Sequence, residues 1–193
     1  MTIGIYGGSF NPIHKGHTEL AKYLCTNGFV DELWFMVSPC NPLKTSSTEL
    51  LDENIRLHLA QIATAKHPQL KVSDFEFRLP RPSYTVDTLS ALRTAFPEHE
   101  FILIIGADNW QVFDRWKDPQ EILSHHRIII YPRPGYDVDL ATLPQGVTMV
   151  NTPLFPISST EIRQRIATGL DYTNFIDTAV AEEIKQNQYY LKP

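Results

Sequence analysis

The sequence predicts an α/β fold in which a Rossmann-like, doubly wound parallel sheet is followed by C-terminal helices. Three observations favour this class. Apolar runs of strand length alternate with stretches of helical periodicity along most of the 193 residues, as expected when each strand is followed by a crossover helix. The runs 101–106 and 127–131 are apolar almost throughout, which is typical of strands covered on both faces. A glycine-containing turn follows the first apolar run, where such sheets bind their ligand.

The first elements are predicted from apolar runs and from the residues that interrupt them. In order, they are a strand over 3–6, a helix from about 16 to 27, a strand over 32–37, a loop over 38–47 and a helix over 52–66. Gly28 is expected to stop the first helix. The helical spacing in 52–66 predicts an inner face formed by Ile55, Leu59, Ile62 and Ala63.

The remaining elements follow the same alternation. They are a short strand or two within 70–77, a helix over 85–96, strands over 101–106, 127–131 and 147–150, a helix from 158 that ends at Gly169, and a last helix over 177–187. The helix over 85–96 is expected to turn Val86, Leu89, Leu92 and Ala95 inward. Ser158 and Glu161 have the spacing of a capping box.

Composition excludes several classes of function. The chain is 42% hydrophobic and 20% charged, as in an ordinary globular domain. A net charge of −5 and an isoelectric point near 5.8 argue against a nucleic-acid surface. Two cysteines are too few for a disulfide framework, and we find no signal peptide and no apolar run long enough to span a membrane. We therefore expect a cytoplasmic protein without nucleic-acid or membrane partners.

The turn after the first strand carries the chemistry of an anion site. It runs Gly7-Gly8-Ser9-Phe10-Asn11-Pro12-Ile13-His14-Lys15-Gly16-His17. Glycines let backbone N–H groups approach an anion, and the following helix adds its positive end. His14 and His17 are three residues apart at that helix start and can point at one ligand. A zinc pair is the alternative, but it needs two more ligands, and Cys25 and Cys40 lack suitable spacing.

Three common motifs are missing from the sequence. The glycines of the first turn do not fit G-x-G-x-x-G, which disfavours an NAD-dependent dehydrogenase. Residues 41–45 lack the glycines of a Walker P-loop. The first turn also misses the G-x-S-x-G nucleophile elbow by one residue.

The turn resembles the HxGH signature of the nucleotidylyltransferase superfamily, and within it the chain is similar to the bacterial nicotinate-nucleotide adenylyltransferase family. Further matching segments occur in family order at 82–89, 106–108, 116, 133–136 and 157–163. The resemblance thus covers residues 4 to about 166. It implies a single nucleotidylyltransferase domain over 1–193, with a helical appendage from about residue 158.

The resemblance also implies the site residues. The catalytic residues would be His14, His17, Lys44 and Arg163. The ATP-binding residues would be Gly8, Ser9, Phe10, His17, Gly106, Asp108, Ile157, Ser158, Ser159 and Arg163. The mononucleotide would be bound by Ser9, Lys44, Thr85, Asp108, Trp116, Lys117 and Arg133. Nicotinate would stack on Trp116, and its carboxylate would meet the backbone N–H groups of Thr85 and Lys117.

The residues alone leave simpler roles open for several of these positions. Ser158 can be an ordinary N-cap, Lys44 a solvent-facing lysine and Trp116 a core aromatic. The sequence also departs from the family at Asn11, where an aspartate is usual, and before Lys44, where a histidine is common.

The activity that the resemblance implies is adenylyl transfer. ATP and nicotinate mononucleotide would give deamido-NAD and pyrophosphate, with Mg²⁺ held mainly by the ATP phosphates and water. Nicotinamide mononucleotide or phosphopantetheine as acceptor, and a non-catalytic nucleotide-binding module, are the alternatives. The oligomeric state stays open, with a homo-oligomer among the options.

Overall fold

The computed structural model describes residues 1–39 and 50–191, and these form a six-stranded sheet in which every neighbouring pair is parallel. The strands are β1 (Thr2–Gly8), β2 (Glu32–Val37), β3 (Leu70–Ser73), β4 (Glu100–Gly106), β5 (Arg127–Tyr131) and β6 (Val147–Met149). They lie in the order β3-β2-β1-β4-β5-β6, which is that of a doubly wound Rossmann-like sheet. The predicted fold class is confirmed.

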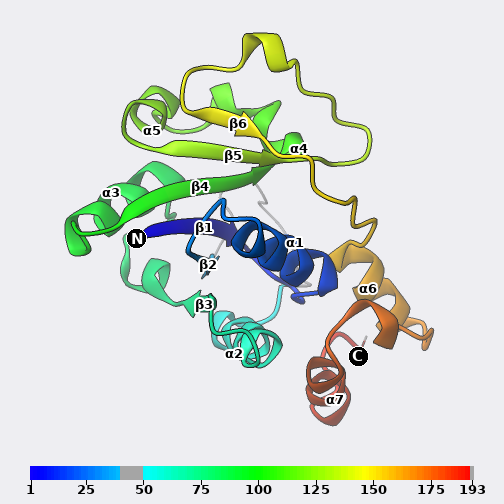
Figure 1. The fold of residues 1–193 in the computed structure, drawn as a ribbon. Helices are drawn as coiled ribbons and strands as arrows, with labels where there is room; N and C mark the ends of the chain where they lie inside the picture. The colour runs from blue at the N-terminus through cyan, green and yellow to red at the C-terminus, as the bar shows by residue number, and fades with distance from the viewer. Residues whose placement is uncertain (40–49, 192–193) are drawn as a thin grey trace.

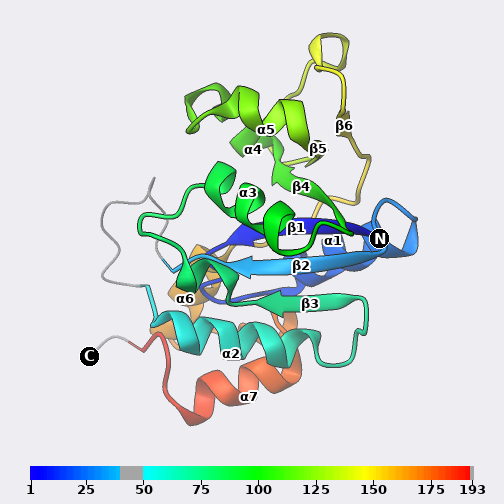
Figure 2. The ribbon, with the colours of Figure 1, turned by 90° about the vertical axis from the view of Figure 1, so that its left-hand side faces the viewer.

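Helices cover both faces of the sheet (Figure 1, Figure 2). One face carries α1 (Lys15–Thr26), α2 (Glu53–Thr64), α6 (Ser159–Ala167) and α7 (Thr178–Gln186). The other carries α3 (Thr85–Ala95), α5 (Pro119–His125) and the short α4 (Ala107–Trp110). Single 3₁₀ turns occur at Phe75–Arg78, Phe113–Arg115, Leu140–Thr142 and Thr173–Phe175.

Strand alternation divides the core into two clusters, one on each face of the sheet. In β1, Ile3 and Ile5 join the cluster under α3 and α5, whereas Tyr6 joins the cluster under α1 and α2. In β4, Leu103 and Ile104 divide in the same way. Both faces of the central strands are buried, and this explains why the sequence shows them as continuous apolar runs.

The inner faces of two helices differ from the sequence prediction. In α2 the buried residues include Arg56, Leu59 and Ala63, while Ile55 and Ile62 are only half-buried. The buried face is therefore rotated by about one residue, and it includes the charged side chain of Arg56, which the predicted inner face did not contain. In α3, Ala95 is exposed, since the helix ends there.

Other expected boundaries agree with the structure. Gly28 and Gly169 follow their helices with φ of 72° and 68°, the left-handed conformation that favours glycine at a helix end. Residues 70–77 form one strand followed by a 3₁₀ turn. No helix within 1–39 and 50–191 is both long and apolar enough to cross a membrane.

The strand order places the sheet's topological switch point between β1 and β4. From β1 the chain winds outward through β2 and β3, and from β4 it winds the other way through β5 and β6. Open α/β sheets bind ligands at the carboxyl ends of the strands beside such a point. The predicted residues at 8–17 and 106–108 follow β1 and β4 directly.

Candidate active site

The loop from β1 to α1 is held in an unusual backbone conformation. Phe10 has φ of 45°, a left-handed conformation that is costly for a bulky residue and needs support from its surroundings. That support is aromatic packing, because the Phe10 ring meets Tyr6 and Phe35 edge-on at 5.6 and 5.3 Å between centroids. A Cβ at position 8 would lie 3.0 Å from the Phe10 ring, so Gly8 is needed for this packing.

The two histidines of the signature stack on each other at the start of α1. Their ring centroids are 3.6 Å apart with planes inclined by 22°. His14 is the N-cap residue, and its backbone N–H donates to His17 Nδ1 at 3.2 Å. A Cβ at position 16 would lie 3.0 Å from the His14 ring, which explains the glycine between the histidines.

Both imidazoles are neutral at physiological pH. Burial, followed by the charge of Arg133, lowers the pKa of His14 from 6.5 to about 3. Burial also holds the pKa of His17 well below its usual value, with further contributions from His14 and Arg133. Because Nδ1 of His17 accepts a hydrogen bond, its proton is on Nε2. His17 thus presents a neutral N–H donor.

Side chains from other elements bind the carbonyl groups of this loop. Arg56 Nη1 donates to the carbonyl of Ser9 at 2.7 Å. Arg163 Nη1 donates to the carbonyl of Asn11 at 2.9 Å, and Ser159 Oγ donates to that of Pro12 at 2.9 Å. In a trans peptide the N–H points opposite to the C=O. The Phe10 N–H therefore points away from Arg56.

Asn11 joins the loop to two distant segments. Its Oδ1 accepts hydrogen bonds from the backbone N–H of Leu51 at 3.2 Å and from the hydroxyl of Tyr190 at 3.0 Å. Both bonds need an acceptor oxygen and no negative charge. This accounts for an amide at a position where the sequence comparison led us to expect a carboxylate.

Charged side chains gather at the carboxyl ends of β4 and β5. Asp108 lies in the first turn of α4, and its Oδ1 is 3.6 Å from Nε of Arg133, which follows β5. Both side chains are about one-third exposed. A Cβ at position 106 would collide with Asp108 and lie 3.1 Å from Arg133 Cγ. Gly106 thus allows the two groups to approach the strand end.

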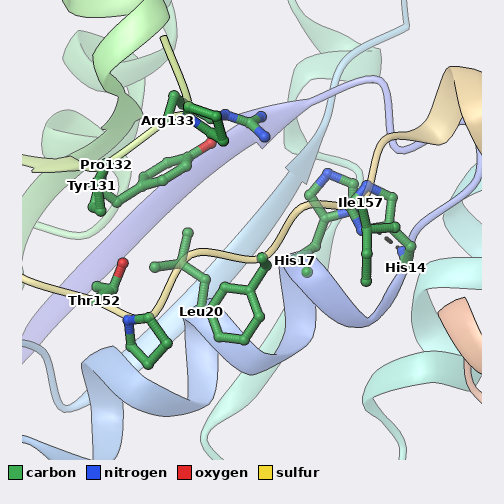
Figure 3. Close-up of a pocket in the computed structure, with 12 residues that line it drawn as sticks. His14, His17, Leu20, Tyr131, Pro132, Arg133, Thr152 and Ile157 are labelled. Atoms are coloured by element: carbon green, nitrogen blue, oxygen red, sulfur yellow. Dashed lines mark hydrogen bonds between the residues drawn. The ribbon is translucent and has the colours of Figure 1, made fainter. Parts of the chain in front are cut away.

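A cavity lies between the histidines and the segment after β5 (Figure 3). The Arg133 side chain extends toward the histidine pair. Tyr131 lines the cavity as well, and its buried hydroxyl is 3.1 Å from the hydroxyl of Tyr6. The other wall comes from residues 152–157, including the buried Thr152 and the half-buried Ile157. Of the predicted residues, His14, His17, Arg133 and Ile157 line this cavity.

The start of α6 lies against the histidine loop. Ser158 is its N-cap and accepts the Glu161 N–H at 3.1 Å, so the Ser158 half of the predicted capping box is present. The Glu161 carboxylate pairs with Arg165 Nε at 3.1 Å. The predicted Ser159 and Arg163 are the two residues that bind the loop carbonyls described above.

The residues predicted for the acceptor lie on the α3 side of the sheet. Thr85 opens α3, and Lys117 reaches its first turn, with Nζ 2.9 Å from Asp87 Oδ2 and 5.0 Å from the Tyr84 ring centroid. Trp116 is half-buried and packs on Phe113 at 5.3 Å between centroids. An open groove beside α3 is lined by Tyr84, Asp87 and Lys117 among others. Lys44 lies outside the described residues.

Buried polar atoms without a hydrogen-bond partner concentrate in the predicted site. Within 1–39 and 50–191 such atoms are His14 Nδ1, His99 Nδ1, Asp108 Oδ1, Trp116 Nε1 and Arg133 Nε. All but the His99 atom belong to predicted site residues. Native structures leave few buried polar groups unsatisfied, so this concentration indicates a site built to receive a polar ligand.

No group of three or more His, Cys, Asp or Glu side chains in the described part of the chain could hold a metal ion. Cys25 is buried and burial raises its thiol pKa to about 11, whereas Cys40 is not among the described residues. The structure therefore adds no support for a zinc site at the histidine pair.

Sequence reasoning missed Arg56, Glu76, Tyr131 and Tyr190. The signal for Arg56 was present, because position 56 lies one turn before the buried positions 59 and 60. Glu76, Tyr131 and Tyr190 carried no local pattern, since their partners are distant in sequence.

Comparisons with known proteins agree on one group. Residues 5–165 match the family model described as cytidylyltransferase-like. A Bacteroides fragilis protein named "Probable nicotinate-nucleotide adenylyltransferase" is 52% identical over 95% of this chain and 90% of its own. A relative of the same name from Flavobacterium psychrophilum is 42% identical over the full length of both. The structure of the Plasmodium falciparum nicotinic acid mononucleotide adenylyltransferase complexed with NaAD superposes with a TM-score of 0.82 at 21% identity, covering 98% of this chain and 97% of its own.

Proposed function

This chain belongs to the cytidylyltransferase-like family and, within it, to the nicotinate-nucleotide adenylyltransferases; on that premise we propose that it transfers the adenylyl group of ATP to nicotinate mononucleotide. A phosphate oxygen of the mononucleotide attacks the α-phosphorus of ATP. The bond from that phosphorus to the bridging oxygen breaks, and the electron pair leaves with pyrophosphate. The product is deamido-NAD, formed without a covalent enzyme intermediate.

This chemistry needs no strong base, because the attacking phosphate is already an anion at neutral pH. What the protein must supply is alignment and stabilisation of charge on the phosphoryl oxygens. Hydrogen-bond donors and cations around a small space meet that need. A nucleophilic side chain is not required.

The observation that carries the proposal is the cluster of unsatisfied polar atoms at the strand ends. His14, Asp108 and Arg133 each keep a buried polar atom without a hydrogen-bond partner among the described residues. They come from three segments, which follow β1, β4 and β5. A bound nucleotide offers both phosphate acceptors and ribose hydroxyl donors, and so matches this mixed set.

On the phosphate side we assign His17 as the main neutral donor through Nε2–H. His14 stacks on it and shares the cavity with Arg133. A neutral donor can bind an oxyanion and strengthen its bond as negative charge grows in the transition state. Ser158, Ser159 and Arg163 would add donors at the start of α6, where unpaired backbone N–H groups favour phosphates.

The backbone of the first loop would complete this cradle. The N–H groups around Gly8, Ser9 and Phe10 are the proposed donors, with Gly106 and Ile157 leaving room for the adenosine part. Lys44, which lies outside the described residues, keeps its proposed role as a phosphate-binding cation.

On the acceptor side Trp116 is the proposed platform for the nicotinate ring. Its exposure is intermediate, and its Nε1 has no hydrogen-bond partner within the described residues. The carboxylate of nicotinate would be met by backbone N–H groups of Thr85 and Lys117. Lys117 lies against the first turn of α3, which supports grouping these residues into one subsite.

A divalent cation fits the residues at the end of β4. Mg²⁺ is bound in proteins by one or two carboxylates together with substrate phosphates and water. Asp108 has a carboxylate oxygen that is buried and lacks a hydrogen-bond partner in the described part of the chain. We propose that Asp108 holds Mg²⁺ through its water or binds a ribose hydroxyl. When bound, the ion would neutralise phosphate charge.

The test is pyrophosphate release from Mg·ATP, with nicotinate mononucleotide and nicotinamide mononucleotide in parallel assays. We expect turnover with the acid and much slower turnover with the amide. Similar rates with both would keep adenylyl transfer and reject the acceptor assignment. If ATP binds but no pyrophosphate is released with either mononucleotide, the assay is repeated with phosphopantetheine. Silence with that acceptor as well would reject the enzyme and favour a nucleotide-binding module.

A further inference from the structure

Two buried charged side chains lie beside the proposed site and take no part in the chemistry above. They are Arg56 in α2, which is 0% exposed, and Glu76 in the 3₁₀ turn after β3, which is 8% exposed. Burying a charge is costly unless hydrogen bonds compensate for the lost water. The partners of each group therefore indicate what its burial achieves.

Arg56 connects three backbone segments through its guanidinium. Nη1 donates to the carbonyls of Ser9 at 2.7 Å and Ser38 at 2.8 Å, and Nη2 donates to that of Pro39 at 3.1 Å. Nε donates to the carbonyl of Leu51 at 2.8 Å. A planar fork of donors can satisfy several carbonyls at once. Arg56 thus ties the carboxyl ends of β1 and β2 to the start of α2.

The Glu76 carboxylate likewise accepts hydrogen bonds from hydroxyl groups of a neighbouring segment. It accepts from Thr88 Oγ1 at 2.9 Å and from Ser83 Oγ at 3.1 Å. Burial raises the pKa of this carboxylate, and the Ser38 side chain, which faces it, lowers the pKa. Ser83 and Thr88 stand on either side of Tyr84 and Thr85, where α3 begins. Glu76 thus fixes the start of α3 to the end of β2.

The two networks meet at Ser38. Its carbonyl accepts a hydrogen bond from Arg56 at 2.8 Å, and its side chain faces the Glu76 carboxylate. On the Arg56 side the network reaches Ser9 in the loop that carries the histidine pair. On the Glu76 side it reaches the turn that contains Thr85. A continuous buried path therefore joins the phosphate side of the proposed site to the mononucleotide side.

We propose that Arg56 and Glu76 are positioning residues that act through Ser38 to fix the two halves of the substrate site relative to each other. This inference rests on the proposed function, since it assumes that ATP and the mononucleotide occupy those halves. In-line attack requires the two substrates to be aligned, and small displacements lower the rate strongly. Neither residue needs to touch a substrate for this role.

Arg56→Lys tests the phosphate side. Lysine keeps the charge and most of the stem, but its single nitrogen cannot occupy both the Nε position that binds Leu51 and the Nη1 position that binds Ser9 and Ser38. We expect kcat to fall at least tenfold and KM for ATP to rise about fivefold, with KM for the mononucleotide within twofold of wild type.

Glu76→Gln tests the mononucleotide side. The amide keeps the shape but replaces one acceptor oxygen by a donor. It therefore cannot accept from Ser83 on one oxygen and Thr88 on the other, as the carboxylate does. We expect kcat to fall about fivefold and KM for nicotinate mononucleotide to rise about fivefold to tenfold, with KM for ATP little changed.

The double variant distinguishes a shared path from two separate structural defects. If both residues act through Ser38, the loss of kcat in the double variant is smaller than the product of the single losses. All parameters are measured at a temperature where circular dichroism shows full folding. Arg165→Lys and Glu100→Gln are the matched controls, because their ion pairs lie outside the network, and they should stay within twofold of wild type.

Single variants with wild-type kcat and KM, or a double variant whose losses multiply, would overturn the positioning role. The wild-type enzyme assayed in the same experiment separates this result from a failure of the proposed function. If wild type forms deamido-NAD and the variants match it, only the inference fails. If wild type forms none, the proposed function fails, and the inference, which assumes that function, is overturned with it.

Discussion

Two arginines at the same edge of the sheet differ in how completely their donors are used. Arg56 is fully buried, and its guanidinium binds four backbone carbonyls at 2.7 to 3.1 Å. Arg133 is about one-third exposed, its Nε meets Asp108 only at 3.6 Å, and that Nε has no hydrogen-bond partner within residues 1–39 and 50–191. Arg56 therefore holds the loops together, whereas Arg133 keeps a donor that a ligand can use.

The difference distinguishes the residues that hold the proposed site in shape from those that bind its ligand. Around β1 and β2 the polar groups of loop and helix satisfy one another, so the loop keeps one shape. Around β4 and β5, and at the histidine pair that shares a cavity with Arg133, polar atoms are left without partners among the described residues; we call this the ligand-ready region. The missing bonds cost stability and provide binding energy when a substrate arrives. Stability and activity should therefore respond differently to substitutions in the two regions.

The largest expected effect is a difference in the free energy of unfolding between variants of the two arginines. Arg56→Met leaves several buried carbonyls without donors, and we expect the free energy of unfolding to fall by about 3–5 kcal/mol. Arg133→Met should change it by less than about 1 kcal/mol. Urea denaturation of both variants measures the contrast. Equal losses would show that the two regions do not differ in this respect.

A comparable effect on activity should occur in the ligand-ready region. His17→Ala removes the neutral Nε2–H donor, and we expect kcat to fall about 10²–10³-fold, with mononucleotide affinity changed less than about threefold. Steady-state kinetics and calorimetry give the two values. Near-normal turnover would contradict the role assigned to the histidine pair.

Acid should destabilise the ligand-ready region, because its histidine is buried in the neutral form. The pKa of His14 is about 3 in the folded state and 6.5 as the ordinary value, so the unfolded chain binds the proton first as the pH falls below 6.5. Stability is fully present above 6.5 and declines toward 3. At about pH 4.5 the loss from this group is about 2–3 kcal/mol.

The control for the acid effect is His14→Gln, which lacks the titrating group. Its free energy of unfolding should decline less steeply than that of wild type between pH 6.5 and about pH 4.5. Parallel curves would show that His14 does not contribute. Arg56 does not titrate in this range, so the bonds that its guanidinium makes should not change with acid.

The smallest expected effect concerns the acceptor. Trp116→Phe keeps an aromatic platform on Phe113 but removes the indole N–H, whose nitrogen has no hydrogen-bond partner in the described part of the chain. We expect KM for nicotinate mononucleotide to rise about threefold to tenfold with KM for ATP unchanged. If KM for ATP rises more than KM for the mononucleotide, Trp116 would be assigned to the ATP subsite instead.

The fold was predictable because its signals are local. Alternating apolar runs and helical stretches indicated the parallel sheet, and Gly28 and Gly169 marked helix ends that the structure confirms. The spacing of His14 and His17 likewise indicated one shared face, and the rings stack. Each of these inferences depends on residues that are close in sequence.

The support of the site was less predictable because it depends on contacts between distant residues. The predicted inner face of its helix did not include Arg56, whose partner Ser9 is 47 positions away. Ser159 and Arg163 were predicted as ligand groups, and the structure shows them also binding the loop that carries the histidines. A sequence pattern cannot separate these two uses of one side chain.

The bond between Tyr190 and Asn11 has a consequence for synthesis of the chain. The two residues are 179 positions apart, so on the ribosome Asn11 emerges well before its partner. At about 5–20 residues per second the delay is roughly 10–35 s. During that interval the first loop lacks one of its anchors, and a nascent chain would acquire its finished nucleotide cradle only after residue 190 has been released from the exit tunnel.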